Sequence, residues 1–312
     1  MGLLKRVDWG FFDIVKLLYD ETDPKLLILG FGSACCYDHK DIVEFLLKKN
    51  NFFGDKSSFF NEGLRGACRS NCQVMIDFLF KKGAMNWCSG LVGACEGGHL
   101  ELSKKIIELS KKNLQCNEIL LKSGLCAACL NNRIDCVNIL LEEIKKKYLF
   151  GQECMDDGFF YSCIGGHIDL IDIMMGDDIE SLKDGFRGAC INGNINIIQK
   201  IKKELKSKLY DVTDDQEFIR TCCFQALVQG HKDVIQYLFC ISKYEIKNCL
   251  SLELAIQRAD IELVRFLVEE NIFIDMDKAK NLSKKHQLFN IYKYLEKITN
   301  NTGKDKKTHS KQ

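Results

Sequence analysis

The chain repeats one short pattern nine times along its 312 residues. A small residue, Ala or Ser, recurs at intervals of 27 to 37 residues, and an aliphatic residue or Met follows it twelve positions later each time. We number the small residue position 6 of a repeat, which makes the later apolar residue position 18. A unit of this length cannot bury its apolar face alone, so the chain must fold by stacking one unit on the next. The nine position-6 residues are Ala34, Ala67, Ala94, Ala128, Ser162, Ala189, Ala226, Ala255 and Ser283.

The spacing inside the repeat predicts a pair of helices and therefore an all-α fold. Position 14 is always apolar, and its separation of four residues from position 18 places both on one face of a second helix. Positions 3, 6 and 7 form the apolar side of a first helix of about nine residues. Residues such as Ser89 and Asp184 at position 1 predict its N-cap. Gly, Asn or Asp at position 10, as in Gly98 and Asn71, predicts a left-handed residue at its end.

The repeats divide the chain into three parts. Residues 1–28 are predicted to form an N-terminal capping half repeat, because residues 10–18 match the second-helix pattern. Residues 299–312 are polar, basic and unpatterned, which predicts a disordered tail. Between them, residues 29–298 hold nine repeats that start near residues 29, 62, 89, 123, 157, 184, 221, 250 and 278.

Several segments resemble ankyrin repeats. GGHLEL (97–102), GGHIDLIDIMM (165–175) and QGHKDVIQYLF (229–239) resemble the family's Gly-His-x-x-(Val/Leu) second-helix signature, and KKGAMNW (81–87) is similar to its Gly-Ala-x-x-Asn connector. The resemblance covers roughly residues 7–298 and implies an α-solenoid of stacked helix-turn-helix repeats. Divergent arrays rich in Lys, Asn and Cys are also similar to those that large DNA viruses of protists encode, which suggests a viral origin.

The chain departs from the ankyrin pattern in two ways. Its two 27-residue steps leave little chain for a projecting β-hairpin, so short or missing hairpins are expected. The family's Thr-Pro-Leu-His helix opening is also absent, and Gly stands at the proline position in six repeats. Each of these glycines is expected to lower the stability of its repeat by about 0.5–1 kcal/mol. They are Gly30, Gly63, Gly90, Gly124, Gly158 and Gly185.

Composition limits the classes of partner and the compartment. The formal net charge is +1, from 44 basic and 43 acidic side chains, so no global field attracts nucleic acid or an anionic membrane. No apolar run approaches the roughly 18 residues of a membrane-spanning helix, and the N-terminus lacks the apolar stretch of a signal peptide. We therefore expect a cytoplasmic protein in a reducing compartment, acting as a monomer.

The cysteines and histidines follow the repeat rather than a catalytic motif. The 17 cysteines could indicate disulfides, a zinc module or small buried side chains. Six of them, including Cys95, occupy position 7, and four histidines, including His99, occupy position 11. Stacked helices lie about 10 Å apart, too far for disulfides between successive repeats. We expect the cysteines to be core residues and the histidines to bond backbone of neighbouring repeats.

No catalytic or cofactor-binding pattern is found. Cys126 and Cys129 form a Cys-x-x-Cys, but they lie on a helix, without a second pair at zinc-ribbon spacing and without nearby basic residues to activate a thiol. Phosphate loops, nucleophile elbows and metalloprotease signatures are absent. We therefore predict no enzyme activity, no metal and no cofactor.

The ankyrin resemblance implies a non-catalytic protein-protein interaction module that binds a protein partner on its concave face. In that family the face is built from connectors and from first-helix positions 5, 8 and 9. Tyr161 and Ile164, one helical turn apart, are expected to expose an apolar patch flanked by Asn131 and Asn192. An alternative is an adaptor that links a client protein to a ubiquitin ligase or another effector. The predicted partner-binding residues are Tyr37, Arg69, Glu96, Asn131, Tyr161, Ile164, Asn192, Gln225, Gln229, Gln257 and Arg258.

Overall fold

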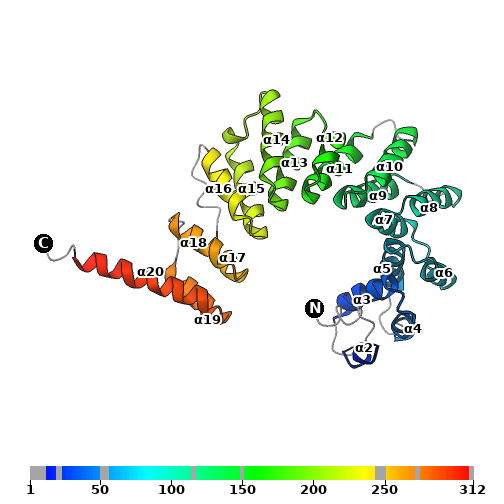
Figure 1. Ribbon diagram of the computed structural model, residues 1–312, viewed down its shortest axis with the longest axis horizontal. Helices are drawn as coiled ribbons and strands as arrows, with labels where there is room; N and C mark the ends of the chain where they lie inside the picture. The colour runs from blue at the N-terminus through cyan, green and yellow to red at the C-terminus, as the bar shows by residue number, and fades with distance from the viewer. Residues whose placement is uncertain are drawn as a thin grey trace. The chain divides into compact units, whose positions relative to one another are not determined.

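The computed structural model describes residues 12–18, 23–49, 56–113, 117–147, 151–242, 251–270 and 275–308. Within these ranges the fold is all-α, and no strand is present. The chain divides into two compact units, Met1–Met175 and Gly176–Gln312, and each is described by itself (Figure 1). None of the described helices combines the length and apolarity needed to cross a membrane.

Unit 1 is built from successive helix pairs. The first helices α3, α5, α7, α9 and α11 pack in a row, each on the next. Each of them also packs on the second helix that follows it. α2, which lies within the predicted capping half repeat, packs on α4 and buries Val15. The helices are α2 (Phe12–Leu18), α3 (Pro24–Cys36), α4 (Lys40–Lys49), α5 (Lys56–Arg69), α6 (Gln73–Lys81), α7 (Trp87–Gly97), α8 (Leu100–Lys112), α9 (Glu118–Leu130), α10 (Ile134–Lys147), α11 (Gln152–Gly165) and α12 (Ile168–Met174).

Unit 2 continues the same scheme. The first helices α13, α15, α17 and α19 form one row, and α14, α16, α18 and α20 pack beside them as second helices. α20 continues through residues 299–308, where the sequence predicts a disordered tail. That segment contains no proline to end the helix. The helices are α13 (Ile179–Asn192), α14 (Ile195–Ser207), η3 (Val212–Asp214), α15 (Gln216–Gln229), α16 (Lys232–Ile241), α17 (Leu252–Gln257), α18 (Ile261–Glu269), α19 (Met276–Lys285) and α20 (Phe289–Thr308).

The predicted core positions are buried in every repeat. Residues at positions 6, 14 and 18 are at most 9% exposed throughout. Serine replaces alanine at position 6 without leaving a polar atom unpaired, because Ser162 Oγ donates to the Gly158 carbonyl and Ser283 Oγ to the Ala279 carbonyl, each over 2.8 Å. The stripe that the spacing predicts is therefore the interface between the two helices of each pair and between successive pairs.

The predicted helix ends are confirmed. Gly98 ends α7 and Gly166 ends α11, both with left-handed backbone, at φ values of 79° and 76°. Position 10 keeps a positive φ even where Ala259 and Gln287 occupy it. L-residues adopt this conformation at a steric cost, so it is imposed by the turn that joins the two helices of a pair.

The predicted helix starts are wrong. α9 begins at Glu118 and α13 at Ile179, so the first helices hold 13 and 14 residues instead of about nine. Their N-caps are Asn117 and Asp178, whose side chains accept hydrogen bonds from the first turn. Position-1 residues such as Asp184 lie inside the helices. The helices extend because further apolar residues, such as Leu120, Leu121 and Leu182, continue the buried stripe towards the N-terminus.

The position-2 glycines lie within helices and not at the helix openings. An added Cβ at Gly63 would come within 2.4 Å of the Phe31 ring, and one at Gly124 would come within 3.0 Å of Leu91. At these two positions the large position-3 residue of one repeat therefore packs against the glycine of the next repeat. The absence of a side chain at Gly63 and Gly124 permits this close stacking, which offsets the helix propensity that glycine loses.

Candidate functional site

The first helices of unit 1 line an open recess of about 530 Å³. We refer to it as the recess. Two residues predicted to bind a partner, Glu96 of α7 and Tyr161 of α11, both line it. Its remaining walls come from α5, α7, α9 and α11, the row of stacked first helices. The structure therefore brings together residues that lie far apart in the sequence.

An ion pair between α5 and α7 forms one side of the recess. Arg65 donates to Glu96 Oε1 through Nε, over 3.0 Å, and through Nη2, and the hydrogen bond with Glu96 is the main reason that the pKa of Arg65 is raised. The Glu96 side chain is only 10% exposed. Its second oxygen, Oε2, has no hydrogen-bond partner among the described residues. A buried acceptor without a donor is costly, so Glu96 retains the capacity to bind one.

A second ion cluster connects α9 and α11. Lys122 Nζ lies 2.7 Å from a carboxylate oxygen of both Glu153 and Asp157. The hydrogen bond with Asp157 contributes most to raising the pKa of Lys122. Glu62 also lies 3.7 Å from Arg65, so these two clusters contain four carboxylates and two cations. Only two of these carboxylates, Glu96 and Asp157, line the recess together with both cations. The charges there are balanced, and the unpaired oxygen of Glu96 favours a partner that brings a hydrogen-bond donor.

Apolar side chains complete the recess. Ile119 at the start of α9 is 69% exposed, and Leu130 at the end of the same helix is 37% exposed. The Tyr161 ring is half-buried and packs edge-on against Phe160. Val92 of α7 adds a further apolar surface. Exposed apolar groups beside a buried carboxylate can supply both area and orientation to a bound protein.

The other predicted residues of unit 1 do not line the recess. Tyr37 is exposed at the end of α3, where its ring stacks on that of His39. Arg69 Nη2 lies 3.7 Å from the thiol of Cys36. Asn131 donates to the carbonyl of Ala127 in its own helix, over 2.9 Å. Asn131 therefore completes its helix end.

Ile164 lies one helical turn from Tyr161 on α11 and is half-buried like it. The apolar patch predicted for this pair includes Asn192 of unit 2. The patch remains a prediction.

Five predicted residues belong to unit 2. Asn192 lines a shallow depression of about 330 Å³ beside the start of α14. Gln225 of α15 is half-buried, and its Oε1 has no partner among the described residues. Gln229 and Gln257 are exposed at the ends of α15 and α17. Arg258 donates through Nη2 to the Gln229 carbonyl, over 2.8 Å, and so stabilises the end of the preceding first helix.

The histidines bond the backbone of the preceding repeat, as predicted. His99 Nε2 lies 2.9 Å from the Arg69 carbonyl oxygen, and His167 Nε2 lies at the same distance from that of Leu130. Arg133 replaces histidine at position 11 of the fourth repeat and donates to the Glu96 carbonyl over 3.1 Å. In each case the accepting residue is position 8, whose carbonyl has no partner within its own helix. The histidines therefore connect repeats.

The cysteines are part of the core, as predicted. All six position-7 cysteines are buried, and no disulfide joins the cysteines in the described ranges. Burial raises the pKa of the Cys126 thiol to about 12 and that of Cys129 to about 11. Both thiols are therefore protonated at neutral pH and are poor nucleophiles. Among the residues that the structure describes, no group of three His, Cys, Asp or Glu side chains lies close enough together to hold a metal ion.

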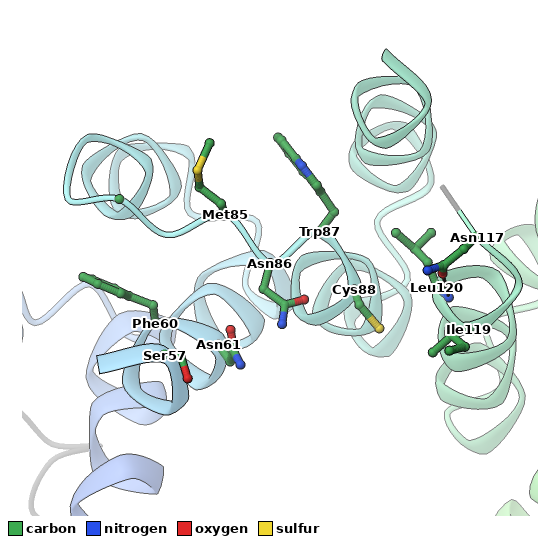
Figure 2. Close-up of a pocket in the computed structure, with 11 residues that line it drawn as sticks. Ser57, Phe60, Asn61, Met85, Asn86, Trp87, Cys88, Asn117, Ile119 and Leu120 are labelled. Atoms are coloured by element: carbon green, nitrogen blue, oxygen red, sulfur yellow. Dashed lines mark hydrogen bonds between the residues drawn. The ribbon is translucent and has the colours of Figure 1, made fainter. Parts of the chain in front are cut away.

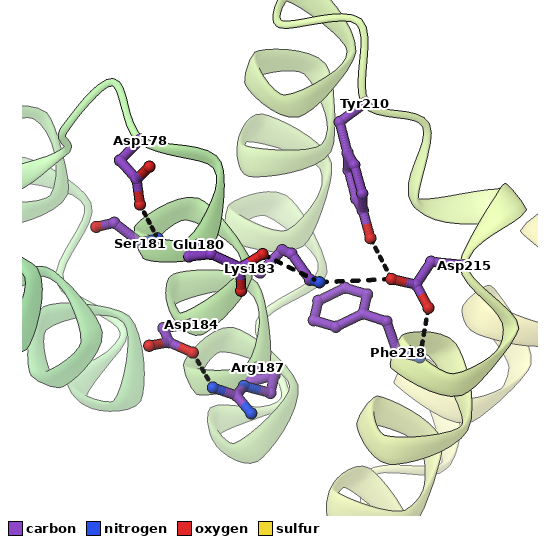
Figure 3. Close-up of polar contacts among 9 residues, drawn as sticks. All are labelled: Asp178, Glu180, Ser181, Lys183, Asp184, Arg187, Tyr210, Asp215 and Phe218. Carbon is purple, nitrogen blue, oxygen red and sulfur yellow. Dashed lines mark hydrogen bonds and ion pairs between the residues drawn. The ribbon is translucent and has the colours of Figure 1, made fainter.

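Unit 2 contains a cluster of a tyrosine, a lysine and an aspartate in contact, a combination that also occurs in catalytic sites (Figure 3). Tyr210 donates its hydroxyl hydrogen to Asp215 Oδ2, and Lys183 lies 3.4 Å from the same oxygen. The other oxygen of Asp215 caps α15 by accepting from the Phe218 amide over 3.0 Å. Burial raises the pKa of Tyr210, and the hydrogen bond from Tyr210 lowers that of Asp215. Each group has a structural partner, so the cluster holds α13, α15 and the connector between them together.

The sequence interpretation missed Arg65, Lys122 and Ile119 as residues of the recess. Lys122 and Ile119 precede position 1, where the first helix was predicted to begin, and they were therefore assigned to a connector. The signal was present in Asn117, a cap residue followed by the buried pair Leu120 and Leu121. No protein-family model and no curated protein matches the chain.

Proposed function

We propose that the protein is a non-catalytic interaction module, an ankyrin-type α-solenoid, that binds a protein partner through the recess of unit 1. Rows of first and second helices, a left-handed residue at every position 10, and side chains that bond the position-8 carbonyl of the preceding repeat support the ankyrin-type repeat. These features recur with the sequence period, as a stacked array requires. A cytoplasmic location, a monomeric state and a viral origin are further parts of this proposal.

The recess is the observation on which the function depends. Its combination of Glu96, with an unpaired buried oxygen, and the apolar surfaces of Ile119, Leu130 and Tyr161 suits a partner side chain that ends in a donor. Other reactive-looking groups have structural roles, because the Cys129 thiol is buried and protonated and Asp215 has structural partners. We therefore favour binding over catalysis.

Affinity capture from the native cell tests this function. Tyr161→Ala combined with Leu130→Ala, both in the recess, is expected to abolish capture of the partner that the wild-type protein retains, while the melting temperature changes little. The matched control is Val74→Ala on α6, which removes an exposed apolar side chain from a second helix. Equal capture by the double variant and the wild-type protein would contradict binding at the recess.

A further inference from the structure

A second, wider groove runs across the N-terminal ends of α5, α7 and α9 in unit 1 (Figure 2). Its volume is about 850 Å³, and among the described residues no charged side chain lines it. Ile119 belongs to both the groove and the recess, so the two are adjacent. The residues considered below are Asn61, Met85, Asn86, Trp87, Asn117 and Ile119.

Two asparagines in this groove are held in fixed orientation by their role as helix caps. Asn86 Oδ1 accepts a hydrogen bond from the Ser89 amide over 3.0 Å, and Asn117 Oδ1 accepts one from the Leu120 amide over 2.9 Å. Each amide group therefore has its oxygen directed at its own helix. The Nδ2 groups are left as donors, and neither has a partner within the described part of the chain.

The spacing of these donors suits an extended peptide backbone. Asn86 and Asn117 cap α7 and α9, which are packed neighbours, and packed helices lie about 8–10 Å apart. A peptide in the extended polyproline II conformation has three residues per turn and rises about 3.1 Å per residue, so its carbonyl groups three residues apart point the same way and are separated by about 9 Å. Asn61 on α5 continues the row of amides on the other side of α7.

The groove also exposes apolar side chains that a peptide would cover. Met85 and Ile119 are each 69% exposed, and the half-buried Trp87 ring packs against Phe80. Covering such surface is favourable, whereas a charged peptide side chain would lose water here without finding an opposite charge. The absence of charge therefore selects against charged peptides.

We propose that this groove binds an extended peptide segment that carries no charged side chains, with its backbone carbonyls accepting hydrogen bonds from Asn86 and Asn117. Its apolar side chains lie against Met85, Trp87 and Ile119. This proposal rests on the proposed interaction function and specifies the chemistry of one segment of the partner.

The probe is a displayed library of random dodecapeptides, selected against the full-length protein. Affinities of the selected peptides, as synthetic peptides, are measured from the fluorescence of Trp87 after Trp9→Phe removes the other tryptophan. The decisive variant is Asn86→Asp with Asn117→Asp. Aspartate caps a helix as well as asparagine does, so folding is preserved while both donors are lost. Its urea unfolding midpoint, compared with that of the wild-type protein, verifies the fold.

Selected peptides are expected to lack charged residues, and the double aspartate variant is expected to bind them about tenfold or more weakly. Met85→Ala should also weaken binding, whereas Val74→Ala should not. Peptides that bind the double aspartate variant as tightly as the wild-type protein would overturn the proposal. So would a selection that yields no binder, or one that yields basic peptides sensitive only to Tyr161→Ala. This last result would move the peptide to the recess and leave the interaction function intact.

Discussion

Two glycines on the same helix are expected to respond in opposite ways to the same substitution. Gly90 and Gly93 both lie on α7, three residues apart. A Cβ at Gly90 would meet its nearest neighbours, the Ile106 and Leu64 side chains, at 3.6 Å, which is ordinary van der Waals contact. A Cβ at Gly93 would lie 2.1 Å from the backbone carbonyl oxygen of Arg65 on α5. Backbone cannot move aside as a side chain can.

The expected magnitudes follow from this difference. Gly90→Ala should stabilise the protein by about 0.5–1 kcal/mol, because alanine loses less conformational entropy than glycine on forming a helix. Gly93→Ala gains the same amount but forces α5 and α7 apart. Overpacking costs about 1–3 kcal/mol, so after the gain of about 0.5–1 kcal/mol is subtracted the net effect is destabilisation by up to about 2.5 kcal/mol.

Urea unfolding, followed by the fluorescence of Trp87 in the Trp9→Phe protein, measures both changes, since Trp87 begins the same helix. The midpoint should rise for Gly90→Ala and fall for Gly93→Ala. Equal shifts, or a lower midpoint for Gly90→Ala than for Gly93→Ala, would refute the inferred packing of successive first helices.

Four further outcomes are expected. His99→Ala should lower the free energy of unfolding by about 1–2 kcal/mol, measured by urea titration, because the Arg69 carbonyl loses its partner. Asp178→Ala should lower the free energy of unfolding by about 0.5–2 kcal/mol, since it removes the cap of α13. Asp184→Ala should lower it less, because it removes only a half-exposed ion pair. The reverse order in urea titrations would indicate that the position-1 residue Asp184 is the helix cap. At neutral pH, alkylation followed by mass spectrometry should modify the exposed Cys240 long before the buried Cys129. Burial raises the pKa of Cys129 from 9.0 to about 11, so above pH 9 the unfolded chain loses this proton more readily than the folded protein does. The free energy of unfolding should therefore fall as the pH rises from about 9 to about 11, and a constant urea midpoint over that interval would contradict this expectation.

The sequence predicted the parts of the fold that depend on spacing and backbone conformation. Residues such as Ala94 and Ile106 had to be buried because only one register places every apolar position on a shared face. Gly98 and Gly166 marked helix ends because few other residues adopt a left-handed backbone without cost. These signals depend only on residues close in the sequence, so they can be recognised without a structure.

The helix starts and most of the recess were not predicted because a polar residue at position 1 can either cap a helix or lie on the exposed side of its interior. Ser123 and Asp157 at position 1 were interpreted as caps, whereas both lie within helices and line the recess. Their polarity reflects exposure and an ion pair with Lys122, which depends on the stacking of α9 on α11. The pairing of Arg65 with Glu96 likewise joins residues 31 positions apart, a relation that only the fold defines.

Site-specific photo-crosslinking in the native cell tests the central claim most directly. A photoreactive phenylalanine derivative replaces Tyr161 in the recess or, as a control, Val74 on α6, and the crosslinked proteins are identified by mass spectrometry. Partner binding at the recess predicts a discrete crosslinked protein from position 161 that is absent from position 74. No crosslink at position 161, or the same products from both positions, would contradict it.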